Sequence, residues 1–232
     1  MTEPASQQDE SSLDNPAYAA LSSTHSRFAQ RSGNALRYPA DVAPFVAIPS
    51  GPSRADWRNA ARLLAPGTAA GIIHDGSPPP RTLKSAQAFE VVQMIEQRAS
   101  HADDPEAILL GAGDVPEMLE LVRRTNPGPF LQRTIELGTY IGFRRDGELV
   151  AMAGERLRFD GWTEISAVCT APGHRGHGLA SRLVSALVAG VRRRSERAFL
   201  HALSSNTEAI RVYERLGFRV RRTGTITVVE PA

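Results

Sequence analysis

The sequence predicts an α/β (α+β) fold in which a central mixed, mostly antiparallel sheet is flanked by helices. Two Asp-Gly dipeptides, Asp146-Gly147 and Asp160-Gly161, separate three apolar segments. This dipeptide suits the positive φ angles of tight hairpins, so the segments are expected to form a three-stranded meander. A glycine-containing loop at residues 175–178 then opens an amphipathic segment. Because helices and strands alternate after this loop, the sheet should lie between helices.

The second half of the chain has the clearest periodicity. Asp114 and Glu117 resemble a capping pair, and Val115, Met118 and Val122 form the apolar face of the helix that follows. The expected strands cover residues 89–95, 108–110, 139–143, 149–157, 163–170 and 199–203, further helices cover 178–194 and 206–216, and a last strand or hairpin covers 218–229 with a turn at Thr223-Gly224.

The first hundred residues are less regular. Residues 1–25 carry four acidic residues, no Lys or Arg and little apolar periodicity, which predicts a disordered or loosely docked tail. Within residues 26–100 one helix is predicted, because Ser53 can cap it and Pro66 follows its apolar stripe. This region is interpreted as an N-terminal extension or a degenerate second copy of the main fold. Residues 101–232 are expected to form the main domain.

Composition narrows the classes of protein that the chain can represent. No stretch approaches the ~20 apolar residues of a membrane span, and the N-terminus lacks a signal-peptide pattern, so a cytoplasmic location is expected. The single cysteine, Cys169, excludes an internal disulfide framework and is expected to pack in the core. Residues 171–222 carry eleven Arg against three Glu, which favours a polyanionic ligand. Nucleic acid is a less favoured partner, because no aromatic residues are interleaved for stacking.

The loop at residues 175–178, Arg-Gly-His-Gly, is typical of a phosphate site. Glycine lets the backbone approach a ligand, and the free N–H groups at the start of a helix favour anions. Arg175 and Arg182 supply charge of a geometry that suits phosphate. A Walker loop is excluded because the only lysine, Lys84, has no glycine beside it, and a dinucleotide fingerprint would need Gly or Ala at Ser181. A glycine turn that merely joins a strand to a helix is the alternative.

Two segments resemble the signatures of GCN5-related N-acetyltransferases (GNAT). Residues 175–180, Arg-Gly-His-Gly-Leu-Ala, are similar to the acetyl-coenzyme A (acetyl-CoA) loop, R/Q-x-x-G-x-G/A. Residues 206–218 resemble the second signature, N-x-x-A-x-x-x-Y-x-x-x-G-F. The resemblance covers roughly residues 106–225 and is closest to the FR47-like subgroup. It implies a GNAT fold, with residues 101–232 as the acetyltransferase domain.

The resemblance also implies a site, with acetyl-CoA as cosubstrate and no metal. Main-chain N–H groups of the loop would hold the pyrophosphate, while the edge of a strand near Val168 and Thr170, together with Asn206, would contact the pantetheine arm. Tyr213 matches the tyrosine that protonates the departing thiolate, and Glu164 matches the strand glutamate that acts as general base. The implied cofactor-binding residues are Val168, Thr170, Arg175, Gly176, His177, Gly178, Ala180, Ser181 and Asn206.

The expected activity is transfer of an acetyl group from acetyl-CoA to a primary amine of a small molecule, amino acid or peptide, by direct attack in a ternary complex. An amine attacks only when it is neutral, so a proton acceptor is required. Glu164, Glu155 and water are all open for that role. The acceptor is open as well, as is the choice between a monomer and a homodimer. A non-catalytic acyl-CoA sensor or scaffold is the alternative function.

Overall fold

The structure, a computed structural model, describes residues 10–74, 79–80, 83–97 and 101–231. Residues 1–9 of the expected tail lie outside these ranges. Within them, eight strands form one sheet in the order β4-β11-β5-β10-β9-β8-β7-β6. These strands are β4 (Ala70–His74), β5 (Leu83–Glu96), β6 (Ile108–Leu109), β7 (Tyr140–Arg145), β8 (Glu148–Phe159), β9 (Trp162–Thr170), β10 (Arg197–Leu203) and β11 (Phe218–Pro231).

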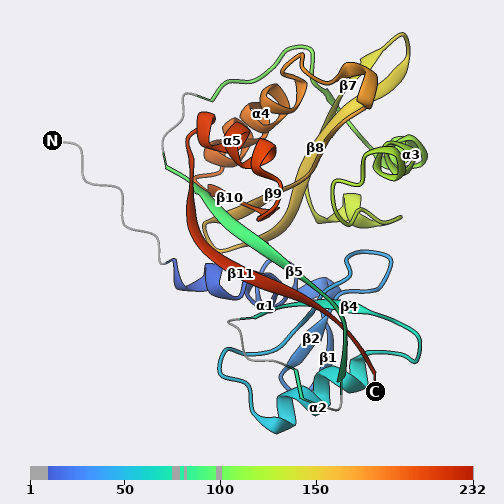
Figure 1. Ribbon diagram of the computed structural model, residues 1–232, viewed down its shortest axis with the longest axis vertical. Coiled ribbons are helices and arrows are strands. Elements are labelled where there is room, and N and C mark those ends of the chain that lie inside the picture. The colour runs from blue at the N-terminus through green and yellow to red at the C-terminus, as the bar shows by residue number, and fades with distance from the viewer. Residues whose placement is uncertain (1–9, 75–78, 81–82, 98–100, 232) are drawn as a thin grey trace, which may run out of the picture.

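Two lobes share this sheet. Figure 1 shows the long strands β5 and β11 running from a lobe that holds α3, α4 and α5 to a lobe that holds α2 and a small antiparallel sheet. The small sheet consists of β1 (Gln30–Ser32), β2 (Ala35–Arg37) and β3 (Val46–Ala47), and the helices are α1 (Pro16–Ser22), α2 (Arg54–Leu63), α3 (Val115–Thr125), α4 (Leu179–Arg193) and α5 (Thr207–Arg215). The mixed, mostly antiparallel sheet flanked by helices confirms the predicted fold class.

The predicted meander is present as β7, β8 and β9, which pair in antiparallel fashion in that order. Asp146 and Gly147 join β7 to β8 with φ angles of 51° and 85°. Two consecutive positive φ angles match the right-handed twist of the strands, which explains why Asp-Gly marked this turn. The expected hairpin at Thr223-Gly224 does not form, because both residues continue β11 and pair with Val92 and Val91 of β5.

The main sheet does not begin at residue 101. Strand β5 lies between β10 and β11 and pairs with both in antiparallel fashion. The expected boundary at residue 101 therefore places an internal strand of the sheet in the wrong domain. Its apolar residues, such as Met94 and Ile95, are fully buried on the two faces of the sheet, so the sheet has no continuous core without them. A degenerate second copy of the fold in residues 26–100 stays a prediction.

Over residues 10–25 the expected disordered or loosely docked tail is wrong. Leu13 and the helix α1 residues Ala17, Ala20 and Leu21 are at most 2% exposed. Their spacing puts them on one face of the chain, where they pack in a core with Trp162 and other residues of the sheet. Helix α1 is only seven residues long, so its periodicity is too short to stand out in the sequence.

Charge also holds this N-terminal segment, defined here as residues 10–22. Arg221 of β11 donates to Asp14 at 2.8 Å and to the main-chain oxygen of Glu10 at 2.9 Å. Arg222 donates to the same oxygen of Asp14 at 2.9 Å. The acidic N-terminus and the arginine-rich C-terminal half, which looked like separate features of the sequence, are therefore partners in the fold.

Replacing Leu13 by alanine tests this docking. Loss of a fully buried leucine should lower the free energy of unfolding by about 2–5 kcal/mol, because the transfer free energy is lost and a cavity remains. Urea denaturation measures the change. The matched control is Leu109→Ala, because Leu109 is 73% exposed and its loss should change stability by less than about 0.5 kcal/mol. Equal effects of the two substitutions would contradict the docked segment.

Candidate active site

The glycine loop leads directly into the N-terminus of α4, as predicted. Gly176 and Gly178 have φ angles of 81° and 72°, and Gly178 is the N-cap residue of the helix. From Gly176 to Ser181 the main-chain N–H groups have no acceptor within the part of the chain that the structure describes. Residues 175–178 are exposed to solvent. Six consecutive N–H groups at the positive end of a helix form a concavity that suits a phosphate or diphosphate group.

The two arginines of this region have different surroundings. Arg182 donates to Asp104 at 2.6 Å and stacks on the ring of Phe143 at 4.5 Å, so protein groups already hold its guanidinium. Arg175 is exposed, and its Nε approaches the main-chain oxygen of Thr170 at 3.4 Å. Of the two, only Arg175 is placed to contact an anion at the loop without giving up an ion pair.

Next to the loop, β9 and β10 separate. They pair in parallel only from Trp162 to Glu164, and the last pair joins Glu164 to Phe199. From Phe199 onward, β10 pairs on its other side with β5. The edge of β9 that faces β10 therefore has no strand partner over residues 165–170, within the part of the chain that the structure describes. An exposed strand edge of this kind can pair with an extended ligand that carries amide groups.

Two further features of β9 fit such a ligand. Ala167 has a φ angle of 52° and lies at an irregularity in the pairing with β8, which marks a β-bulge. The hydroxyl of Thr170 is buried and has no hydrogen-bond partner. A buried polar atom without a partner is costly, so a ligand amide at this position would satisfy it. Val168, the other strand residue expected to line the arm, is half-buried between these two features.

Helix α5 carries the expected tyrosine to the opened side of β9. The ring of Tyr213 packs edge-on against Phe218 at 6.1 Å and joins the core beneath α4. Burial, and then the nearby thiol of Cys169 on β9, raise the pKa of Tyr213 to about 12. Its hydroxyl therefore keeps its proton at neutral pH and can donate it. Asn206 is exposed at the N-cap of α5, where its side-chain oxygen accepts the N–H of Ala209 at 3.1 Å.

Cys169 is part of the core, as predicted. It is 6% exposed, and burial raises the pKa of its thiol to about 11. A thiol in this environment is not a nucleophile at neutral pH.

Glu164 lies in the middle of a buried polar network. Its side chain is 0% exposed, and its two oxygens accept from Arg156 Nε and Nη2 at 2.8 and 2.7 Å. His201 Nδ1 lies 2.7 Å from one of the same oxygens. Burial alone would raise the pKa of Glu164, but the Arg156 charge and the hydrogen bonds outweigh it and lower the pKa to about 2. This geometry speaks against the expected direct role of Glu164 as the base that touches the amine.

Glu155, the rival candidate, is similarly engaged. Its side chain is 5% exposed and accepts from Arg194 at 2.8 Å, and its other oxygen lies 3.3 Å from the N–H of Thr139. Neither glutamate is therefore open to a substrate.

The sequence interpretation missed Arg156 and treated His201 as structural. A signal for the first was present, because counting back from the Asp160-Gly161 turn places Arg156 across from the end of β9 that holds Glu164. His201 gave no comparable signal. Its neighbours come from strands far apart in the chain.

Among the residues that the structure describes, no group of three or more His, Cys, Asp and Glu side chains is arranged to bind a metal ion. In the same residues, no helix is both long enough and apolar enough to cross a bilayer.

Comparison with known proteins agrees with this geometry. The family described as FR47-like protein matches residues 140–226. A structure from Novosphingobium aromaticivorans DSM 12444, assigned to the GNAT family as an acetyltransferase, is 37% identical, with a TM-score of 0.88 over 95% of this chain and 98% of that one. A GCN5-related N-acetyltransferase from Kribbella flavida shares the fold at 18% identity, with a TM-score of 0.62 over 94% of this chain and 95% of that chain. No curated protein matches the chain at a significant level.

The loop at the start of α4, the separated strands and the mixed sheet define an acetyltransferase in general terms. The chain belongs to the GNAT family, within its FR47-like subgroup.

Substituting Glu164 by glutamine tests the buried network. At neutral pH the variant should lose about 3–5 kcal/mol of stability, because Arg156 is left buried without its counter-charge. Since folding lowers the pKa of Glu164 to about 2, its contribution is complete above its ordinary value of 4.5 and is lost as the pH falls toward 2. Urea unfolding at several pH values should show the gap between wild type and variant closing in acid. The exposed Glu148→Gln is the control, and a gap independent of pH would contradict the ion pair.

Proposed function

We propose that the protein is an N-acetyltransferase that transfers an acetyl group from acetyl-CoA to a primary amine of a small molecule, amino acid or peptide, by direct attack in a ternary complex. The observation that carries the proposal is the run of exposed N–H groups without acceptors from Gly176 to Ser181. This feature would be wasted in a loop that only joins a strand to a helix, because such N–H groups gain most from an anionic ligand.

The residues present fit the cosubstrate along its length. The amides of the loop and of the first turn of α4, including those of His177 and Ala180, would hold the pyrophosphate, and Arg175 would add charge. The free edge of β9 at Val168 and Thr170 would pair with the amides of the pantetheine arm, and the unpartnered hydroxyl of Thr170 would gain a bond there. Asn206 would contact the same arm from the start of α5.

When bound, acetyl-CoA supplies the activated acetyl group, and the protein has two tasks. The first is to hold the amine beside the acetyl carbon, which replaces a rare encounter by a fixed geometry. The second is to manage protons. Tyr213 would donate to the departing sulfur, since burial keeps its hydroxyl protonated and α5 carries it to the opened side of β9. A group on the other side must accept the amine proton.

Calorimetry with CoA tests the binding site. Gly178→Ala should raise the dissociation constant at least about tenfold, because a Cβ forces this position away from its φ of 72° and tilts the N–H groups that grip the ligand. Gly173→Ala is the matched control, because Gly173 lies outside the positive-φ positions and has open space around an added Cβ. Failure of the wild type to bind CoA below millimolar concentration would remove the basis of the proposal.

Tyr213→Phe tests the proton donor. The variant should lose about 10²-fold or more in kcat, the range typical of a general acid, while its affinity for CoA stays within twofold. The measurement is release of free thiol from acetyl-CoA with an amine found in a screen of amino acids, polyamines and peptides. Unchanged kcat would remove Tyr213 from the reaction. A wild-type protein that binds CoA but acetylates no amine would favour a sensor instead.

A further inference from the structure

Resting on the proposed acetyl transfer, we propose that His201 is the residue that accepts the proton of the acceptor amine and that Glu164 is a positioning residue that orients it. The sequence left Glu164, Glu155 and water open for proton acceptance. The structure buries both carboxylates in ion pairs and places an imidazole between one of them and a small hollow.

His201 lies at the point where the sheet opens. It is two residues beyond Phe199, the last residue of β10 that pairs with β9. The free edge of β9 starts at the same level and ends about 16 Å away beside the loop, given the rise of about 3.3 Å per residue. An extended arm that starts at the loop and follows this edge ends close to His201. The acetyl carbon is expected at that end.

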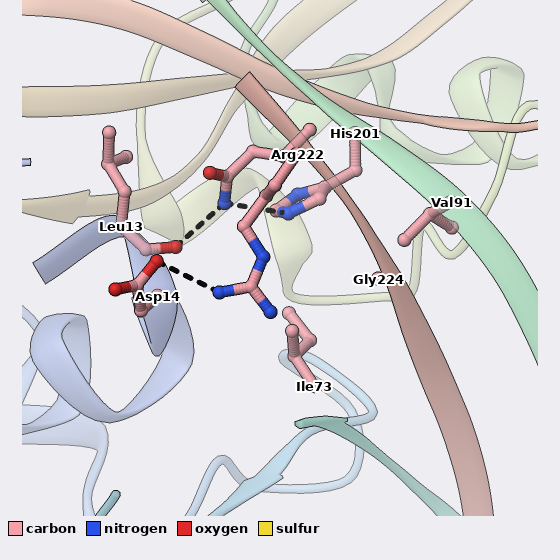
Figure 2. Close-up of a pocket in the computed structure, with 8 residues that line it drawn as sticks. Leu13, Asp14, Ile73, Val91, His201, Arg222 and Gly224 are labelled. Atoms are coloured by element: carbon pink, nitrogen blue, oxygen red, sulfur yellow. Dashed lines mark hydrogen bonds and ion pairs between the residues drawn. The ribbon is translucent and has the colours of Figure 1, made fainter. Parts of the chain in front are cut away.

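The imidazole lines a hollow on the face of the sheet that the N-terminal segment covers. Figure 2 shows His201 at one side of this hollow, with Leu13 and Asp14 of the N-terminal segment at the other. Gly224 of β11 also lines it and contributes no side chain, which leaves space beside the strand. The side chain of His201 is 5% exposed, so an amine that reaches it is also shielded from bulk water.

The hydrogen bonds around His201 define which nitrogen carries its proton. Gln93 donates from Nε2 to the carbonyl of Leu13 at 2.7 Å and accepts through Oε1 from Arg221 at 3.0 Å, so the orientation of its amide is determined. The same Nε2 lies 3.1 Å from His201 Nε2, which must therefore be the acceptor of this contact. The proton of the neutral imidazole is then on Nδ1, where it is donated to Glu164 at 2.7 Å.

This arrangement is that of a base held ready by a carboxylate. With Nδ1–H bonded to Glu164, the lone pair of His201 Nε2 lies on the side of the hollow, where it can take up a proton. The contact to Gln93 is the longest of the hydrogen bonds named above, so an amine N–H can replace it at the smallest cost. The negative charge of Glu164 then stabilises the imidazolium that forms.

The proposed base and the proposed acid lie on opposite faces of the sheet. Phe199 and Leu200 are consecutive residues of β10, and they belong to the cores beneath the N-terminal segment and beneath α4 respectively. His201 shares the side of Phe199, whereas Tyr213 packs on the side of Leu200. The gap between β9 and β10 is open to both. An amine can therefore approach from one face while the sulfur leaves toward the other.

The protons balance across this gap. The amine proton moves to His201 Nε2 as the nitrogen forms its bond to the acetyl carbon. The carbon–sulfur bond breaks, and the sulfur takes the hydroxyl proton of Tyr213. His201 then releases one proton to solvent and Tyr213 regains one, so the neutral amine and the thioester give the amide and the free thiol with no net change.

Other charged groups around the hollow come from the segment that covers it and from β11. Arg222 is paired with Asp14, and Arg221 binds both Asp14 and Gln93. Burial raises the pKa of Asp14, but the two arginines outweigh it and lower that pKa below its ordinary value. These groups stay charged through the neutral range, so an acid limb there is assigned to His201.

Kinetics in the full-length protein test the inference. The probes are acetyl-CoA and the best amine from the screen above, with free thiol as the readout. His201→Gln should lower kcat/KM about 10²-fold or more and remove its acid limb, with the affinity for CoA unchanged within twofold. Glu164→Gln should lower the rate less and displace the acid limb, as expected of a positioning residue. His101→Gln is the matched control, because this half-buried histidine contacts Ser185 of α4 instead.

A measurement without any amine keeps the inference testable if a variant unfolds or the screen finds no acceptor. Long-range nitrogen–proton NMR correlations of wild-type histidine side chains should show His201 with a proton on Nδ1 and none on Nε2 at neutral pH. A proton on Nε2 under these conditions would overturn the proposal, because no lone pair would then face the hollow.

The outcomes separate the two proposals. A wild type that neither binds CoA nor transfers an acetyl group contradicts the proposed function itself. A wild type that transfers the group, combined with a His201→Gln variant that keeps its rate and its acid limb, contradicts the role of His201 alone. Loss of the acid limb in His201→Gln but not in His101→Gln supports it.

Discussion

The site depends on one constraint in the sheet, the three-residue parallel pairing between β9 and β10. Beyond Glu164 and Phe199 the two strands part, and β10 turns its hydrogen bonds to β5. A sheet normally satisfies the backbone groups of an internal strand on both sides. Here the separation leaves an internal strand with one free edge, and a helix N-terminus with free N–H groups follows directly. Both features favour one extended, anionic ligand.

The buried ion pair of Arg156 and Glu164 lies at the point of separation. A charge pair without solvent is costly to bury, and its retention is explained when the carboxylate also orients another group. His201 occupies that third position, and Gln93 links it to the main chain of Leu13. The N-terminal segment is therefore connected to the site through hydrogen bonds as well as through the apolar core beneath it.

Local signals in the sequence predicted much of the fold. The Asp-Gly turns, the apolar stripe of α4 and the capping box of Ser53 and Asp56 each act over a few residues, and the structure confirms all three. The loop with Gly176 and Gly178 was equally visible, because free N–H groups and positive φ angles are local properties. The pairing of β5 was not, since a strand contains no information about which distant strand will lie beside it.

For this protein, the sequence by itself determined the family, the meander, the phosphate-type loop and the helix that carries Tyr213, because each rests on neighbouring residues. Only the tertiary structure decided that residues 10–22 are packed and that Glu164 is buried. It also decided that an imidazole from β10 stands between that carboxylate and the hollow. These outcomes depend on contacts between residues up to about two hundred positions apart, where burial and hydrogen-bond partners exist only once the chain has folded.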